Sequence, residues 1–171
     1  MIYSIIKNDN DILNLMEKFG HFHDSCIKEM HYLSGGWVDQ NLVMYPFNDL
    51  RSVSIIFQRQ GAPNSVIELV FMGINKLNLE PRNEEYDCII YGASLKIAND
   101  IIYWSEYDDF DENDLVNECG TWISARQVMW RELPDALGNQ TIFINSTEQD
   151  GVAVPLNDDS TNLKGLRKPP M

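Results

Sequence analysis

Residues 52–72 carry the pattern that most limits what this chain can fold into. Two runs rich in β-branched and aromatic residues flank a four-residue segment, residues 61–64, that contains glycine, proline and asparagine. Runs of this kind around a short turn predict a β-hairpin. Both faces of its two strands are largely apolar, so neither face can simply contact water. We therefore expect the hairpin to lie inside a sheet that is covered on both sides.

The register of this hairpin follows from the length assigned to its turn. Pairing Gln60 with Ser65 places Ile56 beside Leu69 on one face. The opposite face then carries Val53, Ile55 and Phe57 against Val66, Glu68, Val70 and Met72. This pairing leaves apolar side chains on both faces of the hairpin.

An amphipathic helix is predicted before the hairpin, near the N-terminus. Asn8 is a capping residue, and the acids that follow it suit the positive end of a helix. Gly20 takes the position where a left-handed residue ends a helix. Between them runs one apolar stripe at helical spacing, formed by Ile12, Leu15, Met16 and Phe19. We expect this stripe to cover one face of the central hairpin.

Further strands are predicted on both sides of the hairpin. Apolar and aromatic runs between turn residues place them at residues 26–33, 37–45, 86–98, 101–106, 121–131 and 141–144. Asn99 and Asp100 suit a tight two-residue turn, which would place Leu95 opposite Trp104. The run at 121–131 fits a strand or a short helix. We favour a strand because hairpins dominate the chain before it and turn residues follow it soon.

Consecutive hairpins with one N-terminal helix predict an α+β domain that is mainly β, with the helix packed on an antiparallel sheet. The length of the chain suits a single domain, which we assign to residues 1–144. From Asn145 onward large apolar residues become scarce. Residues 145–171 are therefore expected to form a loosely held tail.

The charge balance limits the partners that the chain attracts. It has 26 acidic and 13 basic residues, and a net charge of −13. A nucleic-acid-binding surface needs the opposite charge, and anionic membranes are disfavoured for the same reason. A basic protein is the partner class that this charge favours. The alternative is that the chain is simply one of many acidic bacterial-type proteins.

Cysteine usage and motif content predict a cytoplasmic protein without a cofactor. Cys26, Cys88 and Cys119 form no C-x-x-C pair, so neither a zinc ribbon nor a thioredoxin-like motif is present. No apolar run has the length of a membrane span or of a signal-peptide core. The glycine-rich motifs that cradle nucleotide phosphates are also absent.

The segment that begins at His21 offers the first candidate chemistry. His21 and His23 would project to one side of an extended segment, where Asp24 or Cys26 could complete a metal site. The same residues are compatible with ordinary hydrogen bonding at a helix-to-strand junction. Cys26 could also act as a nucleophile, with His23 or His31 as its base. A cysteine that leads into an apolar strand more often behaves as a small hydrophobe.

An acidic loop is predicted at residues 106–118, which contain seven acidic residues and no basic one. Its spacing begins like an EF-hand, but the pattern fails where glycine and a bidentate glutamate are required, at Asp114 and Gly120. An irregular cation site and a solvated loop are two alternatives. We favour a recognition surface in which aromatic residues lie between acids, formed by Tyr107, Asp108, Asp109, Phe110 and Asp111.

The sequence Phe-His-Asp-Ser-Cys-Ile at residues 22–27, followed by the apolar runs 53–57 and 67–71, resembles small, largely uncharacterised bacterial domains. Some of those domains resemble immunity proteins that neutralise polymorphic or contact-dependent toxins. The resemblance covers about the first half of the chain and carries over no functional residue. It implies a charge-complementary plug, which fits the acidic composition.

These features predict a non-catalytic protein-binding domain, most sharply an immunity-type protein that occludes a basic toxin. The alternative is a small metal-dependent enzyme built around His21, His23 and Asp24. The first function requires an accessible acidic surface, and the second requires metal ligands that lie close together.

Overall fold

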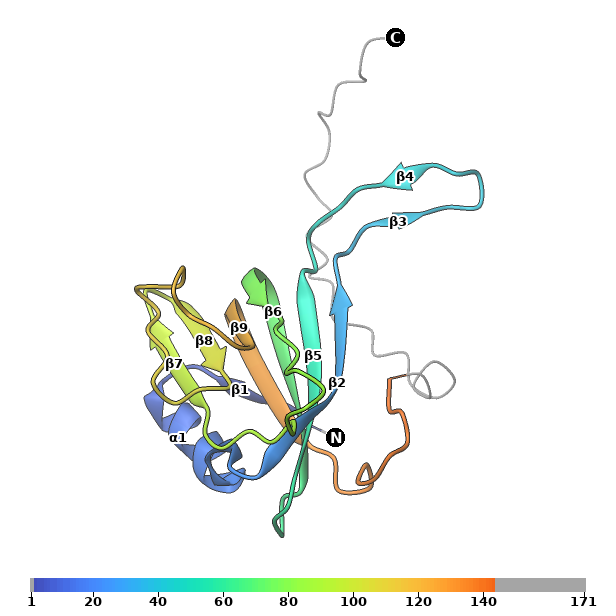
Figure 1. The fold of residues 1–171 in the computed structure, drawn as a ribbon. Helices are drawn as coiled ribbons and strands as arrows, with labels where there is room; N and C mark the ends of the chain where they lie inside the picture. The colour runs from blue at the N-terminus through green and yellow to red at the C-terminus, as the bar shows by residue number, and fades with distance from the viewer. Residues whose placement is uncertain (1, 144–171) are drawn as a thin grey trace.

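The computed structural model describes residues 2–143 of the chain. The elements follow in the order β1 (Ser4–Ile6), α1 (Asp9–Lys18), the 3-10 helix η1 (Gly20–Phe22), β2 (Ser25–Leu33), β3 (Trp37–Val38), β4 (Met44–Tyr45), β5 (Ser52–Arg59), β6 (Val66–Asn78), β7 (Ser94–Ala98), β8 (Ile101–Ser105) and β9 (Trp122–Glu132). In this part of the chain, seven strands form an antiparallel sheet with the order β2-β5-β6-β9-β8-β7, and β1 pairs with β9 (Figure 1). The predicted class is confirmed: an antiparallel, mainly β α+β structure with one N-terminal helix.

The helix α1 forms as its capping signals predict. The side chain of Asn8 accepts hydrogen bonds from the backbone N–H groups of Asn10 and Asp11, at 2.9 and 3.2 Å. These bonds satisfy donors that the start of a helix otherwise leaves open. The predicted apolar stripe is buried in the same core cluster as the inner face of β5, through Leu15, Met16 and Phe19. Packing against the sheet stabilises a helix too short to persist alone.

The central hairpin is formed by β5 and β6, but the predicted register is wrong by one residue. Ile56 pairs with Glu68, and Gln58 pairs with Val66. The inner face is thereby wholly apolar and buried, and consists of Val53, Ile55, Phe57, Ile67, Leu69 and Phe71. The predicted pairing would divide these residues between two faces, because a shift by one residue turns every side chain of a strand over. Joint burial of these side chains selects the observed register.

The outer face of the hairpin is also covered near its turn, as predicted. Ile56 and Val66 pack there against Leu133, in a second and smaller cluster. Glu68 lies on the same face, where its carboxylate accepts a hydrogen bond from Nε of Arg131 at 2.6 Å. The hairpin therefore occupies an interior position in the sheet.

The hairpin of β7 and β8 confirms the second turn prediction. Leu95 pairs with Trp104, and the turn residues Asn99 and Asp100 have positive φ angles of 51° and 62°. Asparagine and aspartate tolerate this left-handed backbone better than most residues. The first strand begins only at Ser94, later than predicted.

The run at 121–131 forms a strand, β9, as predicted. β6 pairs with one side of β9, and β8 and β1 share its other side. β9 therefore separates two hairpins that are consecutive in the sequence. Trp122 and Ile123 are both buried although they point to opposite faces. Burial on both faces removes the alternation that distinguishes a strand from a helix in the sequence.

The sheet curls until the segment before β7 returns to β2 (Figure 1). The backbone N–H of Ile90 donates to the carbonyl of Ser25 at 2.7 Å, in an isolated bridge. The curled sheet encloses aromatic side chains from distant segments. Phe22 and Trp104 contact Phe57 with ring centroids 5.0 and 5.1 Å away, which closes the core.

The predicted single strand at 37–45 is wrong, because this segment reverses direction. β3 and β4 pair with each other and form a two-stranded projection beyond the sheet (Figure 1). The carboxylate of Asp39 accepts hydrogen bonds from the backbone N–H groups of Asn41 and Val43, at 2.8 and 2.9 Å. An aspartate that bonds its own following backbone produces a tight turn. We call residues 34–50 the arm.

The predicted edge strand at 141–144 is wrong for residues 141–143, which form no strand. This segment packs across β2 instead. The carboxylate of Glu29 accepts hydrogen bonds from the backbone N–H groups of Ile142 and Phe143, at distances of 2.8 to 3.1 Å. Ile144 and the predicted tail at 145–171 lie outside the described residues.

Replacing Glu29 by glutamine is expected to reduce the free energy of unfolding by about 1–3 kcal/mol at neutral pH, because hydrogen bonds to a charged carboxylate are lost. Burial raises the pKa of Glu29, but the amides of Phe143 and Ile142, together with Lys28, lower it overall. The charged form is therefore the one that stabilises the fold. The contribution is present above the unfolded-state pKa and is lost as the pH falls through the folded-state pKa.

Urea unfolding of both proteins over a series of pH values measures this effect. The difference in the free energy of unfolding between parent and Glu29→Gln should become smaller as the pH is lowered. The control Glu17→Gln, at an exposed position on α1, should change this free energy little at any pH. A gap that is equally large at neutral and acid pH would show that the charge of Glu29 is not what holds residues 142 and 143.

Candidate binding surface

Connections between the antiparallel strands leave the sheet at two opposite ends. The arm leaves where Leu33 pairs with Ser52, beside the C-terminal half of β6. The connection from β8 to β9 leaves at the same end, because Ser105 and Asn78 both pair with Trp122. We call this the arm end of the sheet. Residues 20–24 and the turn at 61–64 lie at the opposite end.

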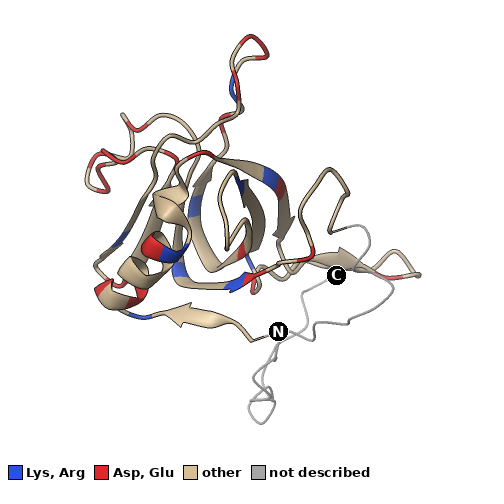
Figure 2. Cartoon of the chain, turned by 90° about the horizontal axis from the view of Figure 1, so that it is seen from below, with Lys and Arg blue, Asp and Glu red and all other residues tan. Residues whose placement is uncertain are grey.

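The acidic loop, residues 106–118, is held in a defined shape at the arm end. Glu106 is buried, and its carboxylate accepts a hydrogen bond from the backbone N–H of Thr121 at 2.8 Å. The ammonium group of Lys96 donates to the carbonyl of Phe110 and lies 3.4 Å from the carboxylate of Glu112. These contacts fix both the start and the middle of the loop. Figure 2 shows many of the acidic residues on loops outside the sheet.

The predicted binding residues of this loop differ in whether their side chains are free to meet a partner. Asp108 and Asp109 are exposed, and so is Tyr107. Asp111 is exposed too, but its carboxylate accepts hydrogen bonds from the backbone and side chain of Asn113, at 2.9 and 3.0 Å. These bonds lower the pKa of Asp111. Its charge is therefore partly used within the loop, whereas Asp108 and Asp109 face solvent.

The surface contact expected at Phe110 has to be corrected. Phe110 is only 1% exposed, and its ring packs 5.7 Å from that of Trp122 and 6.2 Å from that of Tyr103. A phenylalanine between acids is drawn inward because burying its ring removes apolar area from water. Phe110 therefore supports the loop from below, and the loop lacks one of its two predicted apolar contacts.

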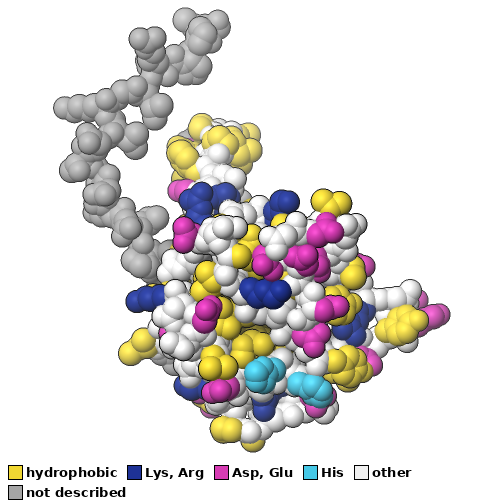
Figure 3. All heavy atoms as spheres, turned by 90° about the vertical axis from the view of Figure 1, so that its left-hand side faces the viewer, with side chains coloured by type: hydrophobic (Ala, Val, Ile, Leu, Met, Phe, Trp, Pro, Cys, Tyr) yellow, Lys and Arg dark blue, Asp and Glu magenta, His cyan; other side chains and the backbone are white. Residues whose placement is uncertain are grey.

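The arm carries the exposed apolar surface that the sequence analysis missed. Trp37 and Phe47 are 54% and 58% exposed, and Leu42 at the tip is 85% exposed. Trp37 stacks on Tyr45 with ring centroids 4.2 Å apart and an interplanar angle of 6°. Figure 3 shows hydrophobic side chains gathered on this projection. A contiguous exposed apolar patch of this kind is typical of an interaction site. The available signal was Asp-Gln-Asn, a turn sequence between two apolar runs.

The candidate metal ligands lie at the opposite end of the sheet. Nδ1 of His23 lies 3.1 Å from the carboxylate of Asp24, and both side chains are at least half exposed. Phe22 between His21 and His23 is buried in the core, and the backbone turns sharply there, with positive φ angles at His21, Phe22 and Asp24. Within residues 2–143, no three His, Cys, Asp or Glu side chains are grouped so that they could hold a metal ion.

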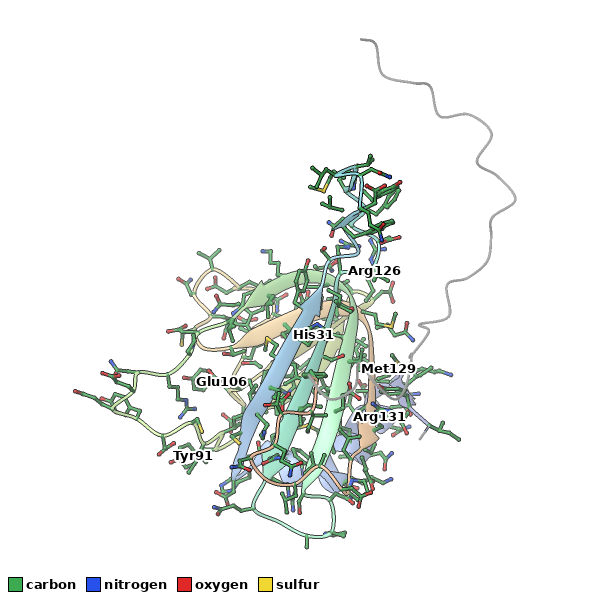
Figure 4. The ribbon with its side chains drawn as sticks, turned by 90° about the vertical axis from the view of Figure 1, so that its right-hand side faces the viewer. His31, Tyr91, Glu106, Arg126, Met129 and Arg131 are labelled. Atoms are coloured by element: carbon green, nitrogen blue, oxygen red, sulfur yellow. The ribbon has the colours of Figure 1, made fainter. Side chains whose placement is uncertain are left out.

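The surroundings of Cys26 are those of a structural thiol, not of a nucleophile. Burial raises its pKa, and the neighbouring Cys88 raises it further. A raised pKa leaves little thiolate at neutral pH, whereas a nucleophilic cysteine needs the thiolate. His31 lies five residues further along β2, roughly 16 Å away in extended chain. The ring of His31, which Figure 4 labels on β2, contacts that of Phe143 instead, with centroids 5.4 Å apart.

A shallow depression of about 330 Å³ lies between β1, the end of α1 and the end of β9. Lys18 and Arg131 contribute its positive charges. Lys18 lies 4.0 Å from the carboxylate of Glu132, and Arg131 pairs with Glu68 at 2.6 Å. Both cations are already paired, so the depression offers little attraction for an anionic ligand.

No family model matches this chain, and neither a curated protein nor a solved structure matches it. None of the helices in the described part of the chain is long and apolar enough to cross a membrane.

Proposed function

We propose that this chain is a non-catalytic protein-binding domain that occludes a basic protein, and in its sharpest form a toxin-neutralising immunity protein. One observation carries the proposal: the acidic loop is held in a defined shape at the arm end, with Asp108 and Asp109 exposed. The net charge of −13 and the resemblance of the first half of the chain to immunity-type domains support the same function.

The mechanism follows from the charge of the loop. Acidic groups on a surface attract a basic partner over several ångströms and raise the rate of productive encounter. Because the loop is anchored through Glu106 and Phe110, its charges do not have to be ordered when the partner arrives. Salt screens this attraction, with a Debye length of roughly 8–10 Å at ordinary ionic strength.

The test begins with the reading frame next to this gene. A basic, toxin-like product would provide the probe, and co-expression with this chain should relieve its toxicity. Its purified form is then mixed with the parent and with Asp108→Asn/Asp109→Asn at several salt concentrations. The variant should associate about threefold to tenfold more slowly at low salt and show a flatter salt dependence.

A matched control removes the same charge elsewhere. Glu17→Gln/Asp135→Asn neutralises two exposed acids away from the arm end, and it should keep nearly the parent's rate. If the loop variant and the control associate equally fast, the acidic loop does not steer the partner. A neighbouring metabolic operon without a toxin-like frame would count against the immunity function.

A further inference from the structure

The arm is the largest feature of the chain that the acidic loop does not explain. Its strands are too short to form a core, and its large side chains point into solvent on a projection from the sheet. The rings of Trp37, Tyr45 and Phe47 form a row, with centroid distances of 4.2 and 6.3 Å. Exposed tryptophan and aromatic rows are costly in water and are enriched among the residues that dominate protein interfaces.

The arm is also ordered before any partner binds. The backbone N–H of Arg51 donates to the carbonyl of Ser34 at 3.2 Å, which closes the base of the arm. The N–H of Gly36 donates to the hydroxyl of Ser34 at 3.1 Å, and the Asp39 carboxylate closes the tip. A projection fixed at both ends loses little conformational entropy when it is bound.

Charge identifies the kind of partner that fits the arm. The charged residues within residues 34–50 are Asp39 and Asp49, and the segment has no lysine or arginine. The acidic loop leaves the sheet at the same end. A second copy would bring a net charge of −13 and a second acidic loop toward the first, and the arm itself presents no cation to an anionic membrane. A protein with basic residues around an apolar groove has complementary charge.

We propose that the arm inserts its apolar tip and aromatic row into a basic-rimmed apolar groove of the partner, and that this contact holds the complex together. This inference rests on the proposed function and assigns association and dissociation of the complex to different parts of the chain. The acidic loop sets the rate of association, and the arm sets the rate of dissociation. Trp37, Leu42 and Phe47 then provide the apolar contact with the partner that the sequence analysis had expected from Phe110.

The experiment measures both rates with the same probe, the purified product of the adjacent reading frame. Trp37→Ala/Phe47→Ala should raise the dissociation rate about tenfold to a hundredfold and change association little, as expected for interface anchors. Leu42→Ser, which keeps the stacked rings, should raise the dissociation rate as well. Leu13→Ala/Leu137→Ala truncates two exposed apolar residues outside the arm and should match the parent.

The outcomes separate the inference from the function on which it rests. If the arm variants dissociate like the parent while Asp108→Asn/Asp109→Asn associates slowly, the arm inference is overturned and the proposed function stands. If the arm variants dissociate faster but the loop variant associates at the parent's rate, the arm contact is supported. The acidic loop then does not steer the partner. Arm-dependent dimerisation in sedimentation equilibrium, or arm-dependent binding to phosphatidylserine vesicles, overturns the inference by naming another occupant.

A second measurement applies if the adjacent product does not bind. A benzophenone amino acid at position 42 of the full chain, irradiated in host cells, labels whatever contacts the tip. An identified basic protein that binds the purified parent but dissociates faster from Trp37→Ala/Phe47→Ala supports the inference. Adducts only to lipid or to a second copy, or no adduct above that of the same group at position 13, overturn it.

Discussion

Phe71→Ala is expected to lower the free energy of unfolding by about 3–5 kcal/mol, the range for deleting a large side chain from a packed core. Phe71 is fully buried and lies opposite Val53 on β5 and Val128 on β9. Its removal leaves a cavity between the two central strand pairings. The surrounding side chains belong to three strands, so they cannot all collapse into the space.

Urea unfolding of parent and variant at neutral pH measures the change. Met72→Ala is the matched control, because Met72 is adjacent in sequence, half-buried and directed to the other face. The control should lose clearly less stability than Phe71→Ala. If Phe71→Ala unfolds at nearly the same urea concentration as the parent, the placement of the hairpin inside the core is wrong.

Glu68→Ala is expected to lower the free energy of unfolding by about 2–4 kcal/mol, because it leaves a largely buried cation without its partner. Glu68 is 5% exposed, and its carboxylate accepts hydrogen bonds from Arg131 at 2.6 Å and from the hydroxyl of Tyr3 at 2.8 Å. The guanidinium of Arg131 also lies over the ring of Tyr3, 4.7 Å from its centroid. The group ties β1, β6 and β9 together.

The double variant Glu68→Met/Arg131→Met distinguishes the contribution of the ion pair from that of side-chain packing at the same positions. Replacing both charges by apolar side chains of similar length should recover most of the stability lost in Glu68→Ala. Burial raises the pKa of Tyr3, and so do the hydrogen bond and charge of Glu68. In Glu68→Ala the pKa of Tyr3 should move back toward its ordinary value, which nuclear magnetic resonance can follow. A double variant as unstable as Glu68→Ala would show that Arg131 does not depend on this carboxylate.

The sequence predicted the acidic loop of the candidate site but not the exposed arm. The density of acids at 106–118 identified the loop and its exposed charges, because seven like charges cannot be buried together. The fate of Phe110 depended on Trp122 and Tyr103, which reach it from β9 and β8. In the arm, Trp37 was predicted to lie in a strand of residues 37–45. It is exposed because Asp39 reverses the chain before this segment can join the sheet.

The sequence by itself determined those elements whose causes are local. Asn8 starts α1, Asn99 and Asp100 make the tight turn, and apolar runs of strand length produce an antiparallel, mainly β structure. Capping, turn conformation and periodicity act between residues a few positions apart, so a single stretch contains the whole signal.

Only the tertiary structure decided the register of β5 and β6, the place of β9 between two hairpins, and which aromatic residues are buried. A shift of one residue leaves the turn chemistry of residues 61–64 nearly unchanged but divides the buried face of the hairpin. β9 is selected as a central strand by β6, β8 and β1, whose residues are far from it in the chain. These choices depend on the burial gained jointly by distant segments, and that quantity is not present in any one stretch of the sequence.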